Sequence, residues 1–234
     1  MNDKEVKSIL VIGGSSSLGP SIINRFTNKN YKVFSTFFSS SESTNKELNF
    51  FLDLNNNNSI LNFANKEEIK KAKFDVVIFL SGILPGKSID DYSFDEIEEV
   101  TSINFTGIAK TFKSLKNSFA NKSKIIFISS ISATRGSYDP IYSASKGALI
   151  SFMKSIYLWS NGSILTTAIN PNLIDNSTMF NEMNKSRQDF HMKNSPNGKL
   201  TTIDEFSEII LDLVSSDFCD INGKVIEVNG GSIV

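Results

Sequence analysis

The sequence predicts an α/β fold in which a doubly wound parallel sheet of about seven strands is flanked by helices in three layers. Short apolar runs rich in Val, Ile and Phe alternate with longer segments of helical periodicity, which is the pattern of βαβ units. The runs are apolar throughout, as expected for parallel strands buried on both faces. A glycine-rich turn links the first apolar run to the first helical segment, an order typical of doubly wound sheets.

Seven strands and five helices are expected along the chain. The strands are expected at residues 8–12, 32–36, 49–52, 76–80, 124–129, 165–169 and 224–228. The helices are expected at residues 19–28, 59–71, 93–120, 141–159 and 202–214. A reciprocal capping box, in which a hydroxyl and a carboxylate satisfy backbone N–H groups, supports two of the helix starts. The two pairs are Ser93 with Glu96 and Thr202 with Glu205.

Residues 173–200 are polar and lack clear periodicity. Apolar side chains are scattered through them at Met179, Phe180, Met183, Phe190 and Met192. A loop of this length in a compact domain often covers a site. The segment is therefore either a lid or a helical flap that packs its own Met and Phe side chains.

Length and composition fit one domain over residues 1–234, since 40% of the residues are apolar and 21% are charged. A formal net charge of −1 without a basic stripe argues against nucleic acid or an anionic membrane as a partner. The polar start leads directly into a strand, and no apolar run approaches the roughly 20 residues of a membrane span, so we expect no signal peptide and a cytoplasmic protein. One cysteine, Cys219, and one histidine, His191, exclude disulfide and His/Cys metal frameworks.

The turn after the first strand has the composition of a phosphate-binding loop. Pro20 follows it and suits the first turn of a helix, where its missing N–H would have had no partner. A strand, a glycine-rich turn and a helix N-terminus together present backbone N–H groups to a pyrophosphate. The residues expected to bind the phosphates are Gly13, Ser15, Ser16, Ser17, Leu18 and Gly19.

If the glycine-rich turn binds the pyrophosphate of a dinucleotide, the end of the second strand indicates whether that dinucleotide is NADP or NAD. An acidic residue that binds a ribose 2′-hydroxyl is expected about 20 residues after the turn. The sequence has Phe37, Phe38 and three serines, Ser39 to Ser41, at this place. Because no carboxylate would repel a 2′-phosphate and hydroxyls are present to donate to one, the sequence favours NADP. Phe38 and Ser39 are the expected contacts.

Tyr142 and Lys146 are four residues apart in an expected helix and therefore lie one turn apart on the same face. A cation beside a phenol stabilises the phenolate and lowers the phenol pKa from its usual value of about 10. Such a tyrosine is able to exchange a proton with a substrate oxygen.

With the glycine turn, Tyr142 and Lys146 in this order, the chain resembles the short-chain dehydrogenase/reductase family from residue 8 onward. The resemblance implies a Rossmann fold and an NAD(P)-dependent oxidoreductase that transfers a hydride between nicotinamide and a carbonyl or alcohol substrate. Members similar to this chain include 3-oxoacyl-carrier-protein reductases. The family loop T-G-x-x-x-G-x-G is matched at Gly13 and Gly19, whereas Ile12 replaces the threonine and Ser17 replaces the middle glycine.

The resemblance also implies a role for particular residues. The catalytic set is Asn104 in a proton relay, Ser130 beside the substrate oxygen with Ser129 as the alternative, Tyr142 as general acid or base, and Lys146 on the nicotinamide ribose. The further cofactor contacts are Asp53 and Leu54 at the adenine, Ser81 and Gly82 where the family has N-N-A-G, and Pro171 and Ile174 at the nicotinamide. Tyr142 and Lys146 count among the cofactor contacts as well.

Other functions stay open at this point. The substrate is a 3-oxoacyl group or another small ketone, with a sugar or polyol as the alternative class. A non-catalytic module that senses NADP(H) is favoured by Ser17 and the altered N-N-A-G site, but a sensor has no need of a proton relay. A structural subunit that binds no nucleotide would leave the glycine turn without a purpose.

The resemblance implies a homodimer or homotetramer built through the expected helices at 93–120 and 141–159. The second helix has more apolar surface than one buried face requires, which agrees with such an interface.

Overall fold

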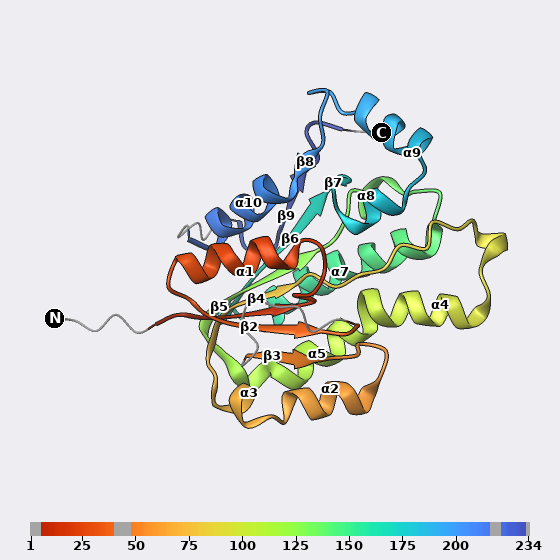
Figure 1. Ribbon diagram of the computed structural model, residues 1–234. Helices are drawn as coiled ribbons and strands as arrows, with labels where there is room; N and C mark the ends of the chain where they lie inside the picture. The colour runs from red at the N-terminus through yellow and green to blue at the C-terminus, as the bar shows by residue number, and fades with distance from the viewer. Residues whose placement is uncertain (1–5, 40–47, 216–220, 233–234) are drawn as a thin grey trace.

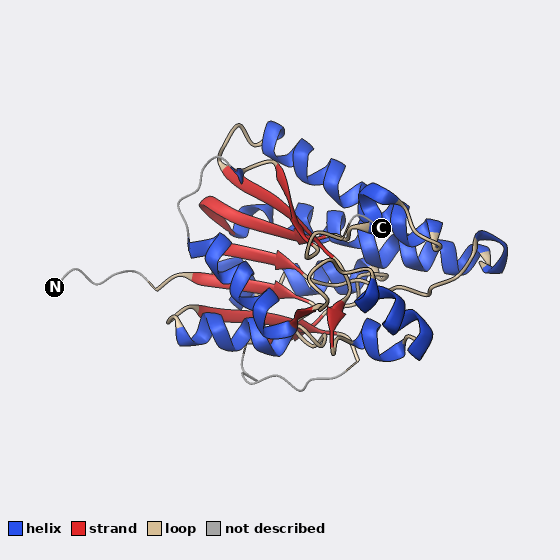
Figure 2. Ribbon diagram, turned by 90° about the horizontal axis from the view of Figure 1, so that it is seen from above, coloured by secondary structure: helices blue, strands red, loops and turns tan. Residues whose placement is uncertain are grey.

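The computed structural model describes residues 6–39, 48–215 and 221–232. Its centre is a seven-stranded parallel sheet in the order β3-β2-β1-β4-β5-β6-β9, with helices on both faces (Figures 1 and 2). The strands are β1 (Ser8–Ile12), β2 (Lys32–Phe37), β3 (Asn49–Phe51), β4 (Phe74–Phe79), β5 (Phe119–Ile128), β6 (Ile164–Pro171) and β9 (Lys224–Val228). The predicted three-layer α/β fold is confirmed.

Two groups of helices cover the sheet. Helices α1 (Gly19–Asn28) and α10 (Ile203–Ser215) pack on one face, above the sheet in Figure 1. Helices α2 (Asn57–Ala64), α5 (Gly107–Leu115) and α7 (Pro140–Trp159) pack on the other. Five further helices in the described part of the chain are short: α3 (Glu67–Lys71), α4 (Phe94–Thr101), α6 (Ser132–Arg135), α8 (Thr178–Glu182) and α9 (Lys185–Lys193).

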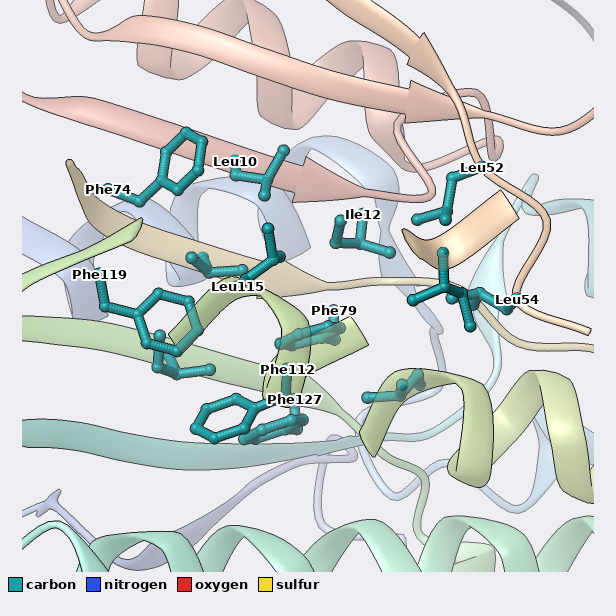
Figure 3. Packing of buried hydrophobic residues seen from close by; sticks show 14 of the residues in the cluster. Leu10, Ile12, Leu52, Leu54, Phe74, Phe79, Phe112, Leu115, Phe119 and Phe127 are labelled. Carbon is teal, nitrogen blue, oxygen red and sulfur yellow. The ribbon is translucent and has the colours of Figure 1, made fainter. Parts of the chain in front are cut away.

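The strands are apolar throughout because each supplies side chains to two cores. Along β1, Leu10 and Ile12 face the core under α5 and α7, whereas Ile9 and Val11 face the core under α1 and α10. Figure 3 shows the first core, which is rich in phenylalanine. Phe79 and Phe127, on neighbouring strands, stack with their ring centroids 5.1 Å apart.

Two expected helices differ in extent from those in the structure. The helix expected at 59–71 is two helices, α2 and α3, and Asn56 caps the first by accepting hydrogen bonds from the N–H groups of Asn58 and Ser59. The helix expected at 93–120 ends at Leu115, and β5 begins at Phe119. Long-range contacts override local periodicity there, since Phe119 pairs with Phe74 of β4.

The segment 173–200, called the flap below, contains two short helices. Strand β7 (Ile174–Asp175) pairs with β8 (Thr201–Thr202) at its two ends, and α8 and α9 lie between them. The side-chain amide of Gln188 donates to the carbonyl oxygens of Phe180 and Met183, which joins α9 to α8. Neither helix has a fully buried residue, so the Met and Phe side chains pack less completely than a self-contained flap would require.

Within the described ranges, no helix has the length and apolar character needed to cross a membrane. The same residues contain no cluster of His, Cys, Asp and Glu side chains suited to a metal ion.

Candidate active site

The predicted site residues lie at the carboxyl edge of the sheet, around β1 and β4. From β1 the chain passes to β2 on one side and later returns to β4 on the other. Doubly wound sheets bind ligands at the point where the strand order reverses in this way. Strands β1, β4, β5 and β6 end at this edge, beneath the flap of α8 and α9 (Figure 1).

The turn after β1 requires glycine at two positions. Gly13 has a φ of +88°, and a Cβ there would lie 2.4 Å from Ser81 Oγ. A Cβ on Gly19 would lie 2.0 Å from the carbonyl oxygen of Gly14. The N–H of Gly13 donates to Thr36 Oγ1 at 2.9 Å, a contact that nothing in the sequence signals. The two glycines therefore let the chain turn tightly enough to place the start of α1 at the sheet edge.

The geometry of this turn fits an anionic ligand. Helix α1 begins after Leu18 without a side-chain cap, and its first turn carries no acidic residue. Ser16 Oγ is buried and has no hydrogen-bond partner in the described part of the chain. A helix start that no side chain caps and an unpaired buried hydroxyl are features that suit a pyrophosphate. The chain therefore has the groups to hold the phosphates of a dinucleotide.

Ser17 differs from the glycine that it replaces in the family loop. Its Oγ accepts a hydrogen bond at 3.0 Å from the N–H of Thr178, the first residue of α8. The hydroxyl thereby ties the glycine turn to the flap. Ser17 therefore contacts the flap, in addition to its predicted contact with the phosphates.

The predicted ribose-phosphate end lies where β2 ends. Phe38 is 63% exposed, and its ring centroid is 6.1 Å from that of Phe51 on β3. Ser39 is also exposed. Ser40 and Ser41 lie outside the described residues. The described part of this region is thus an exposed aromatic pair followed by a hydroxyl.

The predicted adenine contacts follow β3. Asp53 Oδ1 accepts from the N–H of Asn55 at 2.8 Å, which folds Asp53 into a local turn. Leu54 is buried, and a Cβ on Gly107 would lie 2.2 Å from its carbonyl oxygen. Helix α5 therefore packs directly against this turn and holds it at the sheet edge.

Tyr142 and Lys146 face the same side of α7, as predicted. Both are buried, at 5% and 3% exposure, and Lys146 Nζ lies 6.0 Å from the centroid of the Tyr142 ring. Lys146 Nζ also donates to the carbonyl oxygen of Ile128 at 3.0 Å. A Cβ on Gly82 would lie 2.7 Å from this amine, so the glycine after β4 makes room for it.

The two serines after β5 have separate contacts. Ser129 Oγ donates to the carbonyl oxygen of Lys146 at 2.9 Å and so joins β5 to α7. Ser130 Oγ accepts from the N–H of Ser132 at 3.1 Å, and its hydroxyl lies close enough to the Tyr142 phenol to lower the pKa of that phenol. Of the two alternatives, Ser130 is the one beside the phenol.

The electrostatics of the pair differ from the sequence-based expectation. Burial raises the pKa of Tyr142, the hydrogen bond with Ser130 opposes the rise, and the negative charge of Asp139 adds to it. Burial lowers the pKa of Lys146 to about 8. The predicted lowering of the Tyr142 pKa by Lys146 is therefore not seen. The physical reason is that burial disfavours both charges, and the amine is directed at a backbone carbonyl.

Asn104 lies in a π-helical turn, Ser102–Thr106, between α4 and α5. Such turns occur frequently at functional sites. Its side chain is fully buried, with Oδ1 accepting from the N–H of Ile83 at 2.8 Å. Nδ2 donates to the Ile83 carbonyl oxygen and to Ser145 Oγ. The side chain thus joins the segment after β4 to Ser145 of α7.

The predicted nicotinamide contacts, Pro171 and Ile174, are buried at the end of β6 and in β7. Asn170, just before them, was not predicted. Its Nδ2 donates to Glu227 Oε1 at 3.0 Å, but its buried Oδ1 has no partner among the described residues. A buried acceptor without a partner is uncommon in proteins, and it fits a ligand that brings a donor to this end of the site. Asn170 is buried by elements that are distant in the sequence, and no local pattern predicts such contacts.

Asp139 was also missed. It precedes Pro140 at the start of α7, and Asp followed by Pro is a recognisable helix-start signal.

Known proteins match the chain over nearly its whole length. A family model described as enoyl-(acyl carrier protein) reductase matches residues 14–232. The 3-oxoacyl-[acyl-carrier-protein] reductase of Buchnera aphidicola subsp. Schizaphis graminum is 31% identical over 238 residues, covering 97% of each chain. That of Buchnera aphidicola subsp. Baizongia pistaciae is 32% identical over 243 residues, covering 97% of this chain and 98% of the relative.

Solved structures share the fold. A short chain dehydrogenase family protein from Francisella tularensis has a TM-score of 0.86 at 24% identity, covering 97% of this chain and 98% of that one. A short-chain dehydrogenase/reductase from Serratia marcescens has a TM-score of 0.87 at 18% identity, with the same coverage. At these identities the likeness concerns the fold alone.

Proposed function

The chain belongs to the short-chain dehydrogenase/reductase family of NAD(P)-dependent oxidoreductases, and on that premise we propose that it reduces the ketone of a 3-oxoacyl thioester or another small ketone with NADPH. The observation that carries the proposal is the buried phenol of Tyr142, with the hydroxyl of Ser130 near it and Lys146 on the same helix face. The substrate class is supported by the full-length similarity to 3-oxoacyl-[acyl-carrier-protein] reductases.

Residues of this chain manage the proton of the reaction. A bound nicotinamide would supply the hydride for the carbonyl carbon. Tyr142 donates its phenolic proton to the carbonyl oxygen, and Ser130 donates a hydrogen bond to that oxygen as negative charge develops. The raised pKa of Tyr142 keeps the phenol protonated at neutral pH, which suits a general acid. With a pKa of about 8, Lys146 is mostly charged at neutral pH and is available to the ribose hydroxyls.

The first test is turnover. The purified protein, supplied with NADPH and acetoacetyl-coenzyme A, is expected to consume both. The fall in absorbance of the reduced nicotinamide measures this consumption. Calorimetry with NADPH alone gives the binding affinity. Binding without turnover on a panel of 3-oxoacyl thioesters, small ketones and sugars would favour the sensing module and reject the proposed reaction.

The two serines provide a sharper test of the site. Ser130→Ala is expected to lower kcat by a factor of about 10² to 10³, the usual cost of one donor to a developing oxyanion. Ser129→Ala removes a bond between β5 and α7, so its main effect should be on the free energy of unfolding, by about 1 kcal/mol. Steady-state kinetics and denaturant unfolding of both variants check this pair. The assignment is wrong if Ser129→Ala loses the greater part of kcat.

NADPH is expected to bind more tightly than NADH. No carboxylate is present at Phe37, Phe38 or Ser39 to repel a 2′-phosphate, and hydroxyls are available to donate to it. Titration of the protein with each cofactor by calorimetry measures the ratio of the two Kd values. Placing a carboxylate at the end of β2 with Ser39→Asp should shift the ratio toward NADH, and Asn28→Asp, at the exposed last residue of α1, serves as a charge-matched control. Equal or tighter binding of NADH by the unmodified protein would contradict the preference.

A further inference from the structure

A buried carboxylate connects the helix that carries Tyr142 to a segment on the other side of the site. Asp139 is the residue before α7 and is 2% exposed. Its Oδ1 accepts from the N–H of Tyr142 at 2.9 Å and so caps the helix. Its Oδ2 accepts from the N–H groups of Gly86 and Lys87, at 2.9 and 3.3 Å, and from the hydroxyl of Tyr92 at 2.8 Å. Two oxygens thus serve four donors.

The three donors on Oδ2 belong to the segment between β4 and α4. That segment begins at Gly82, beside Lys146, and is held at Ile83 by the side chain of Asn104. Asp139 holds it a second time, at Gly86 to Tyr92. The segment that borders the catalytic amine is therefore clamped at both ends, and one clamp is also the helix cap nearest to Tyr142.

A cap alone does not explain the carboxylate. Serine, threonine or asparagine would cap the helix equally well. Only a group that accepts on both oxygens satisfies Tyr142 on one side and three donors on the other, and an ionised carboxylate is acceptor-only. Within the described ranges no cation forms an ion pair with Asp139, so its charge is stabilised by hydrogen bonds at the start of α7.

We propose that Asp139 is a positioning residue that clamps the segment 83–92 onto the start of α7 and, through its negative charge, keeps Tyr142 in the neutral form that donates a proton. The proposal rests on the role of Tyr142 in the proposed function. It adds a direction to that role, since a neutral phenol serves reduction of a carbonyl, whereas oxidation of an alcohol needs the phenolate.

The charges around Asp139 and Tyr142 agree with this assignment. On α7 itself the facing cation is Lys146, whose own charge is disfavoured by burial. From the clamped segment, Tyr92 faces Asp139 and its pKa is raised by burial, by the hydrogen bond to Asp139 and by that carboxylate's charge. Lys87 pairs with Glu96 of α4, and its amine lies 6.0 Å from the centroid of the Tyr92 ring. Asp139 also contributes to the raised pKa of Tyr142, after burial.

The test compares Asp139→Asn with two controls. The asparagine keeps an oxygen for the Tyr142 N–H but removes the charge and the acceptor for the segment. Tyr92→Phe removes one clamp bond and keeps the charge. Asp91→Asn removes a carboxylate from the same segment that bonds only locally, to Ser88.

The readout is the pH above which ketone reduction falls as the general acid deprotonates. Removing a negative charge lowers the pKa of a nearby phenol. The rate of ketone reduction by Asp139→Asn should therefore begin to fall at a pH about one unit lower than for the unmodified protein, a typical environmental shift. Tyr92→Phe and Asp91→Asn should fall off where the unmodified protein does. If Asp139→Asn loses rate but falls off at the unchanged pH, its role is structural and the proposal is overturned.

Two measurements separate this proposal from the proposed function. Amide hydrogen exchange at residues 83–92 should speed up at least several-fold in Asp139→Asn, whether or not the enzyme turns over, and unchanged exchange would reject the clamp. Activity retained by Tyr142→Phe would reject the proposed function and leave the clamp standing. Denaturant unfolding verifies that each variant is folded.

Discussion

Replacing Tyr142 with phenylalanine should lower kcat for ketone reduction by a factor of about 10² to 10⁴, the usual contribution of a positioned proton donor. The ring keeps its packing in the buried site, and only the hydroxyl near Ser130 is lost. Binding of NADPH should change little, because Lys146 and the glycine turn are untouched. Steady-state kinetics measures the first effect, and calorimetry with NADPH measures the second.

The matched control is Tyr157→Phe. Tyr157 lies on the same helix but its side chain reaches the surface, away from the serines and Lys146. This variant should retain the activity of the unmodified protein. Comparable activity in Tyr142→Phe and Tyr157→Phe would remove Tyr142 from the mechanism.

Adding a methyl group at Gly19 is expected to abolish binding of the cofactor. The new Cβ would lie 2.0 Å from the carbonyl oxygen of Gly14, which is backbone and cannot rotate away. The turn must therefore open and move the uncapped start of α1 away from the phosphate position. Overpacking of this kind also costs about 1 to 3 kcal/mol of stability. Calorimetry with NADPH and denaturant unfolding of Gly19→Ala measure the two effects.

Gly147→Ala is the control for this substitution. Gly147 lies within α7, and the nearest atom to an added Cβ is the Ala133 carbonyl oxygen at 3.5 Å, an ordinary contact. Alanine inside a helix is favoured over glycine by about 1 kcal/mol, so this variant should bind NADPH and be at least as stable as the unmodified protein. Normal NADPH affinity in Gly19→Ala would show that the glycine turn is not the phosphate site.

The strands and the turns between them were predictable because their signals are local. An apolar run such as 8–12 and the glycine turn after it are encoded in adjacent residues, and β1 spans those residues in the structure. The pairing of Tyr142 with Lys146 follows from helical spacing alone. The resemblance then supplied the family, which the comparisons confirm.

The choice between Ser129 and Ser130 was not predictable in the same way. It depends on which hydroxyl lies near the Tyr142 phenol after β5 and α7 have packed, and the Ser129 hydroxyl donates instead to the carbonyl oxygen of Lys146. The bond from Thr178 to Ser17 joins residues 161 positions apart. Neither contact has a local pattern, because each forms between elements that meet only in the folded chain.

The sequence by itself determined the α/β fold, the glycine turn and the presence of a phenol and an amine on one helix face, since spacing and residue type suffice for these. Only the tertiary structure decided the state of the phenol. Burial of Tyr142 and the nearby charge of Asp139 raise its pKa, whereas the sequence alone predicted a lowering by Lys146. The reason is that the desolvation of a group and the positions of the charges near it depend on everything packed around it. Spacing along the chain specifies neither.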